Sequence, residues 1–204
     1  MNTQTVCNEL GIINPWPQSA PNVKPDSHGW FAAANQDMLN RTLTPEMRVL
    51  ELGAWLGTST RFIAQHCKHL ITIDHWIGTY EEHTKENNDY YKKLYTLYNT
   101  FLVNSWHLKD SILPVRAWIQ VGMDMLLEKG YAPDLIYIDA GHTYEDAKND
   151  ILKALQFPGN PIICGDDFRW GVDLPVQKAV KEVAKDNGFE IFDHGMYWRY
   201  LNQE

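Results

Sequence analysis

Short apolar runs alternate with segments of helical periodicity along this chain, and that alternation restricts its fold more than any other feature. Five of the runs have the length and composition of β-strands: 49–52, 70–74, 112–116, 135–139 and 161–165. A candidate helix follows each of them, and the run at 135–139 is apolar on both faces, as a central parallel strand should be. Two last strands, at 189–192 and 196–201, flank an Asp-His-Gly turn typical of a hairpin. The pattern predicts an α/β fold, namely a doubly wound, mostly parallel sheet with an antiparallel C-terminal strand.

The chain has 204 residues, which is enough for one domain with a sizeable core. Residues 1–28 contain four prolines and are expected to be extended or irregular, and residues 29–204 are expected to form the single domain. Within that domain, 77–108 joins a polar loop to a tyrosine-rich helix and is a candidate lid over a binding site. Pro114 predicts an edge position for the third strand. The predicted helices are 30–43, 59–66, 89–102, 123–129, 144–155 and 176–187.

Charge and cysteine content limit the classes of partner. The net charge is −8 and the pI is near 5.4, which argues against nucleic acid or an anionic membrane as a partner. The three cysteines form no metal-binding pair and fit a reducing compartment. The N-terminus lacks the features of a signal peptide, and no apolar run is long enough to span a membrane. We therefore expect a cytoplasmic protein.

A glycine turn follows the first strand and is a candidate ligand site. Gly53 and Gly57 are four residues apart, so the G-x-G-x-x-G pattern of dinucleotide-binding folds is absent. A turn of this kind suits a ligand with an amino-acid portion and no phosphates. Glu51 could meet the ammonium of such a ligand, while the glycines allow its close approach to the backbone. The alternative is an ordinary strand-to-helix turn that needs glycine for its shape.

Asp74 ends the second strand, where a carboxylate commonly accepts hydrogen bonds from both hydroxyls of a ribose. His75 and Trp76 follow it and could wall an adenine. The alternative roles for Asp74 are a helix cap or a solvated loop residue.

Three more carboxylates come at the ends of the fourth and fifth strands, namely those of Asp139, Asp166 and Asp167. Ligands bind at the carboxyl ends of strands in open α/β sheets, so these residues could face the glycine turn across one crevice. Three carboxylates suit a hard cation such as Mg²⁺. The alternative is that Asp166 or Asp167 caps the turn that follows.

Taken together, these segments resemble a known family. The stretches 49–60 (VLELGAWLGTST), 73–74 and 134–145 resemble class I S-adenosylmethionine-dependent methyltransferases, which have a Rossmann-like fold. More narrowly, 138–145 (IDAGHTYE) with 165–168 (GDDF) resembles the metal-dependent small-molecule O-methyltransferases of antibiotic and macrolide-sugar pathways, which are related to catechol O-methyltransferase.

The resemblance covers roughly residues 28–201 and implies a methyltransferase-like domain with S-adenosylmethionine as its cofactor. This chain has IDAGH where relatives often have IDGxH, so the turn after Asp139 is expected to differ in detail. The resemblance implies that the methionine end of the cofactor binds at Glu51, Gly53 and Gly57. It implies that the ribose binds at Asp74 and the adenine at Ala117 and Trp118, and that Asp139 also belongs to the cofactor site. It further implies that Asp139, Asp166 and Asp167 bind the metal and that His142 is the general base.

The favoured hypothesis is therefore Mg²⁺-dependent methyl transfer to a hydroxyl of a small acceptor. A bound cation would lower the pKa of that hydroxyl, and an imidazole would take its proton. The alternatives are a metal-dependent hydroxylase-like enzyme and a non-catalytic S-adenosylmethionine-binding module, with a nicotinamide-dependent oxidoreductase least favoured by the glycine spacing. By analogy with relatives, a homo-oligomer is possible, whereas the sequence does not define the acceptor.

Overall fold

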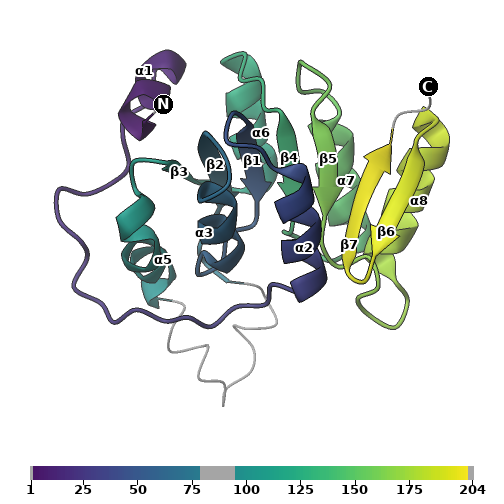
Figure 1. The fold of residues 1–204 in the computed structure, drawn as a ribbon, viewed down its shortest axis with the longest axis horizontal. Coiled ribbons are helices and arrows are strands. Elements are labelled where there is room, and N and C mark those ends of the chain that lie inside the picture. The colour runs from purple at the N-terminus through teal and green to yellow at the C-terminus, as the bar shows by residue number, and fades with distance from the viewer. Residues whose placement is uncertain (1, 79–94, 202–204) are drawn as a thin grey trace.

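The computed structural model describes residues 2–78 and 95–201. Within them, one seven-stranded sheet has the order β3-β2-β1-β4-β5-β7-β6 (Figure 1). The first five strands are parallel, and β7 pairs antiparallel with both β5 and β6. The strands are β1 (Arg48–Leu52), β2 (His69–Asp74), β3 (Ile112–Arg116), β4 (Leu135–Ile138), β5 (Ile162–Gly165), β6 (Glu190–His194) and β7 (Tyr197–Leu201).

Helices cover both faces of this sheet, as Figure 1 shows. One buried apolar cluster joins one face to α1, α6, α7 and α8, and a second joins the other face to α2, α3 and α5. The doubly wound, mostly parallel sheet with an antiparallel C-terminal strand is therefore confirmed. The helices are α1 (Thr3–Leu10), α2 (Ala33–Thr42), α3 (Thr58–Ala64), α5 (Leu97–Ser105), the 3₁₀ turn η2 (Trp106–Leu108), α6 (Ile119–Glu128), α7 (Tyr144–Ala154) and α8 (Pro175–Asn187).

The strand order also explains two sequence patterns. β3 lies at the edge of the sheet, which confirms the position expected from Pro114, because proline cannot donate a ladder hydrogen bond. β1 and β4 lie in the middle and are almost entirely buried, which accounts for apolar side chains on both of their faces.

The N-terminal segment corrects one prediction. Residues 1–28 were expected to be extended, but α1 forms there and buries Val6, Cys7 and Leu10 in the core. The Asn2 side chain caps the helix by accepting a hydrogen bond from Thr5, and Gly11 ends it in a left-handed conformation. The prolines all come after this helix, so they leave it intact. Residues 12–28 contain no helix or strand, as expected, and the helix predicted at 30–43 begins at Ala33. The segment between α1 and α2 runs down one side and then along the lower edge of the domain in Figure 1.

The candidate lid at 77–108 falls into two parts. Residues 79–94 lie outside the described residues, and so does the start of the helix predicted at 89–102. The described remainder contains α5, whose Leu97 and Phe101 are buried in the second apolar cluster. This half of the segment therefore belongs to the core. In the described chain, no helix has the length and apolar character needed to cross a membrane.

Candidate active site

The predicted site residues meet at one edge of the sheet, where the parallel strands end. Backbone hydrogen bonds link the segments that leave these strands. The N–H of Gly53 donates to the carbonyl of Ile73 (2.9 Å), that of Asp139 to the carbonyl of Leu52 (2.8 Å), and that of Asp166 to the carbonyl of Ile138 (3.0 Å). The glycine turn, Asp74 and the three later carboxylates thus lie along a single edge, as parallel strands require.

The glycine turn is shaped by close packing of the chain on itself. Gly53 has φ +88°, and a Cβ there would lie 1.9 Å from the Asp139 carbonyl oxygen. Gly57 has φ +83°, and a Cβ there would meet the Ser105 hydroxyl and the Phe101 ring of α5. Both glycines are needed for internal packing, and their contact with a cofactor stays a prediction.

Glu51 lies on β1 beneath the turn and is completely buried. Its two carboxylate oxygens accept hydrogen bonds from the hydroxyls of Ser59 and Thr60, each at 2.6 Å. Burial raises the pKa of Glu51 to about 7, and these hydrogen bonds oppose that shift. The carboxylate thus holds the first turn of α3 to β1, a role that the sequence did not reveal. Its contact with a ligand ammonium stays a prediction.

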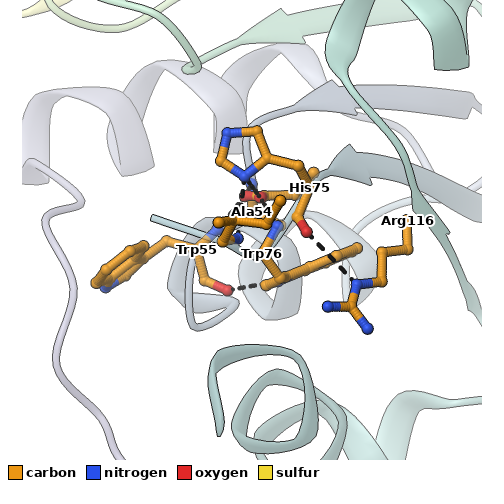
Figure 2. A network of polar contacts seen from close by, with 7 residues as sticks. Ala54, Trp55, His75, Trp76 and Arg116 are labelled. Carbon is orange, nitrogen blue, oxygen red and sulfur yellow. Dashed lines mark hydrogen bonds and ion pairs between the residues drawn. The ribbon is translucent and has the colours of Figure 1, made fainter. Parts of the chain in front are cut away.

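Asp74 forms the centre of a polar network between the first two strand ends. Figure 2 shows its partners Ala54, Trp55 and Trp76. Its Oδ2 accepts hydrogen bonds from the backbone N–H groups of Ala54 (3.0 Å) and Trp55 (2.9 Å). Its Oδ1 accepts one from the N–H of Trp76 (2.6 Å). The sequence placed Asp74 at a strand end but gave no sign that it binds the glycine turn, because the partners are some twenty positions away.

The residues predicted at the adenine lie beside Asp74. Ala117 donates its N–H to the Asp74 carbonyl (3.0 Å), which places Trp118 next to the end of β2. The Trp118 side chain is 62% exposed, and its ring centroid is 4.5 Å from that of His75. These two rings form an edge-to-face pair in which Trp118 is exposed and His75 is partly buried. The suggestion that Trp76 walls an adenine is wrong, since Trp76 is 2% exposed and packs into the core.

All four residues predicted for metal binding and catalysis line one pocket, namely Asp139, His142, Asp166 and Asp167. The four side chains do not all bring their ligand atoms close together, however. The oxygens of Asp139 and Asp167 and a nitrogen of His142 lie within 4.8 Å of one another, whereas Asp166 is outside this group. His142 Nε2 is 2.8 Å from Asp167 Oδ2.

Asp166 lies apart from these three ligand atoms, and its role as a metal ligand stays a prediction. It is buried, and its Oδ1 accepts a hydrogen bond from the Asp167 N–H (2.7 Å). Asp167 itself has φ +60°, a left-handed conformation that aspartate adopts more readily than most residues. This turn of the backbone brings the Asp167 carboxylate to His142.

The pKa values of the pocket residues are shifted because several carboxylates lie close together where little water reaches them. Burial, followed by the charges of Asp166 and Asp167, raises the pKa of Asp139 well above its ordinary value. Burial alone would lower the pKa of His142, but its hydrogen bond to Asp167 and the nearby carboxylates raise it overall.

Trp170 is a neighbour of this cluster that sequence reasoning missed. It lies on the loop after β5, is 45% exposed, and its ring centroid is 5.0 Å from that of His142. Its position depends on the path of the loop after Asp167, which no motif in the sequence defines.

Comparison with known proteins places this architecture in a family. A family model described as a methyltransferase domain matches residues 50–166, which is more than half of the chain. That match contains the glycine turn, Asp74, Asp139, His142 and Asp166. No curated protein sequence matches the chain significantly.

Several solved structures share the fold at low sequence identity. The O-methyltransferase from Bacillus cereus in complex with SAH has a TM-score of 0.61 and 14% identity, over 87% of this chain and 84% of that chain. TomG, an O-methyltransferase from Streptomyces achromogenes involved in tomaymycin synthesis and solved with SAM, has a TM-score of 0.59 and 13% identity, over 85% and 82%. Precorrin 8w decarboxylase from Methanobacterium thermoautotrophicum has a TM-score of 0.60 and 11% identity, over 89% and 100%.

The named activities of these neighbours differ, so their likeness establishes the fold alone. The match to the family model covers most of the residues that build the site, up to Asp166, and confirms the resemblance found in the sequence. The chain belongs to the methyltransferase domain family and has the class I methyltransferase fold.

Proposed function

We propose that this protein transfers a methyl group from S-adenosylmethionine to a hydroxyl of a small molecule, with a divalent cation such as Mg²⁺ bound at the acidic cluster. The observation that carries this proposal is the contact between the two predicted sites. Gly53 of the turn lies directly against the carbonyl of Asp139, whose side chain belongs to the cluster. A methyl donor and a coordinated hydroxyl would therefore be neighbours. The neighbours named as O-methyltransferases, solved with SAH or SAM, support the same chemistry.

The residues at the end of β2 suit the adenosine part of the cofactor. The exposed Trp118 ring offers a flat apolar face to a base, and the partly buried His75 ring packs edge-on against it. Asp74 Oδ1 accepts one backbone hydrogen bond and keeps capacity for another, which a ribose hydroxyl can supply. Bound there, the cofactor would supply the electrophilic methyl group.

The cluster suits a divalent cation because the ligand atoms of two carboxylates and one imidazole lie within 4.8 Å of one another. Carboxylate oxygens favour Mg²⁺, whereas an imidazole suits transition metals better. Asp139 and Asp167 would hold the cation, which would lower the pKa of the acceptor hydroxyl and fix its position.

His142 is placed to take the proton from that hydroxyl. If its Nε2 donates to Asp167 Oδ2, 2.8 Å away, the tautomer is fixed and Nδ1 is the atom that accepts a proton. Asp167 then orients the imidazole and stabilises its charged form. Beside it, the half-exposed Trp170 offers an apolar contact to the acceptor.

The test is calorimetric titration of metal-stripped protein with S-adenosylhomocysteine, with and without Mg²⁺, followed by methyl-transfer assays on hydroxylated acceptors. Asp139→Asn and Asp167→Asn should lose the Mg²⁺ dependence of activity, and His142→Gln should lower kcat about 100-fold, as expected when a general base is lost. Asp166→Asn should affect Mg²⁺ affinity less, and an equal loss would identify Asp166 as a third carboxylate ligand. Absence of S-adenosylhomocysteine binding in either condition would overturn the proposal.

Measurements on the same purified protein distinguish the alternatives that the sequence left open. A hydroxylase-like enzyme would bind iron in preference to Mg²⁺ and consume oxygen. A non-catalytic module would bind S-adenosylhomocysteine, transfer no methyl group to any acceptor and be indifferent to His142→Gln.

A further inference from the structure

Two tryptophans next to the predicted cofactor site have an unusual backbone conformation. Trp55, in the middle of the glycine turn, and Trp76, just after β2, both have φ +48°. This left-handed region is unfavourable for a bulky side chain. Such a conformation persists only where surrounding contacts enforce it.

Trp55 is held from both sides of its backbone. Its N–H donates to Asp74 Oδ2 (2.9 Å), and its carbonyl accepts a hydrogen bond from the indole Nε1 of Trp76 (2.8 Å). Figure 2 shows the Trp76 ring reaching the Trp55 carbonyl, while the Trp55 ring points the other way. The Trp76 N–H donates in turn to Asp74 Oδ1 (2.6 Å), so one carboxylate and one indole fix both strained residues.

The indole of Trp76 is itself firmly placed. It is 2% exposed, and its ring centroid lies 4.8 Å from that of Tyr98 and 4.7 Å from that of Phe101, both on α5. Phe101 also occupies the space beside Gly57 at the other end of the turn. The strained turn is therefore tied through Trp76 to a helix of the core.

We propose that Trp76 is a positioning residue that holds the glycine turn in its strained conformation, ready to receive the cofactor. This inference rests on the proposed function. Trp76 is buried and acts through Trp55, without contact to the cofactor. A preset turn spares the ligand the cost of ordering it, so loss of the indole N–H should weaken cofactor binding. The chemical step at saturating cofactor should be unaffected.

The experiment compares Trp76→Phe with Trp16→Phe. Phenylalanine keeps an aromatic ring against α5 but removes the N–H. Trp16 is a matched control, because its indole also donates to a backbone carbonyl, that of Ile112 (2.7 Å), at the edge strand β3. Both variants lose one indole hydrogen bond and should lose similar stability. A benzothienyl analogue of tryptophan at position 76 keeps the ring shape, lacks the N–H and guards against misfolding of Trp76→Phe.

Two readouts are needed. Hydrogen exchange of the 53–57 amides should accelerate roughly three- to tenfold in Trp76→Phe, which corresponds to one net hydrogen bond. The Kd for S-adenosylhomocysteine and the KM for S-adenosylmethionine should rise by a similar factor with kcat unchanged, while Trp16→Phe alters none of these.

The outcomes separate the two proposals. The role of Trp76 would be overturned if the wild type binds S-adenosylhomocysteine but neither variant at position 76 changes the amide exchange rates of 53–57 or the Kd. Faster exchange with an unchanged Kd would also overturn it, because the turn would then be held for stability alone. Absence of binding by the wild type would overturn the proposed function, and the positioning role with it.

Discussion

Replacing Glu51 with glutamine should remove a loss of stability that the wild-type protein suffers as the pH rises. Glu51 is completely buried on β1, and its carboxylate accepts hydrogen bonds from Ser59 and Thr60. Burial raises its pKa from the ordinary 4.5 to about 7, since the charged form loses its hydration there. Glutamine keeps the size of the side chain and one carbonyl acceptor, and the two hydroxyls can turn to meet its amide group.

The sign and size of the effect follow from the two pKa values. At pH values below 4.5, Glu51 is protonated in both states, and its contribution to stability is fully present. At higher pH, the unfolded chain has released this proton while the folded protein still holds it. The free energy of unfolding then falls by up to about 1.36 kcal/mol per pH unit until the pH passes the folded pKa. From 4.5 to about 7, the loss amounts to about 3 kcal/mol.

Urea unfolding followed by circular dichroism, between about pH 5 and about pH 8, measures this loss. The stability of Glu51→Gln relative to wild type should rise by about 2.5 kcal/mol over that range, since the first part of the loss occurs below pH 5. Glu46→Gln, at an exposed side chain, controls for the loss of one negative charge. Parallel stability curves for wild type and Glu51→Gln would refute the reasoning. The titratable and charged groups coupled to Glu51 remain in the variant, and they are Arg61, Cys67, Asp74 and Asp139.

Two further predictions concern the turn and the aromatic pair. Gly53→Ala should cost more than about 2 kcal/mol in urea unfolding, because its Cβ would clash with the Asp139 carbonyl at φ +88°. Gly188→Ala, at φ +72° with open space around it, should cost only about 1 kcal/mol, and equal losses would contradict the packing role of Gly53. Trp118→Ala should weaken S-adenosylhomocysteine binding about tenfold in calorimetry, since base stacking on an aromatic ring contributes about 1–3 kcal/mol. An unchanged affinity would move the adenine site away from the His75–Trp118 pair.

Most of the fold could be predicted because each central strand and each amphipathic helix carries its own local pattern. The α1 helix was missed since the prolines of the first 28 residues dominated the interpretation. The signals for it were present in Asn2 as a cap and Gly11 as a stop. They are weak ones, because an eight-residue helix depends on tertiary burial more than on its own sequence.

The site was predictable to the level of strand ends but no further. Parallel strands bring Asp74, Asp139 and Asp166 to one edge whatever the loops do. Which side chain then faces a metal depends on the backbone that follows. Adjacent residues of an extended chain point to opposite faces, so Asp166 and Asp167 could not be expected to act alike. The left-handed φ of Asp167 brings that carboxylate to His142, a contact that no sequence pattern indicates.

Asp74 has two roles that a single substitution cannot separate, one structural and one proposed for the cofactor. Its carboxylate holds three backbone N–H groups and is also the predicted partner of a ribose. A loss of cofactor affinity in Asp74→Ala would therefore not identify a ribose contact, because the glycine turn would lose its anchor as well. Trp76→Phe loosens the turn and leaves the carboxylate in place, so its loss of affinity measures the contribution of the turn alone. If Asp74 also binds the ribose, removing the 2′-hydroxyl from S-adenosylhomocysteine should weaken binding to Trp76→Phe as much as to the wild type, but should have little effect on Asp74→Ala.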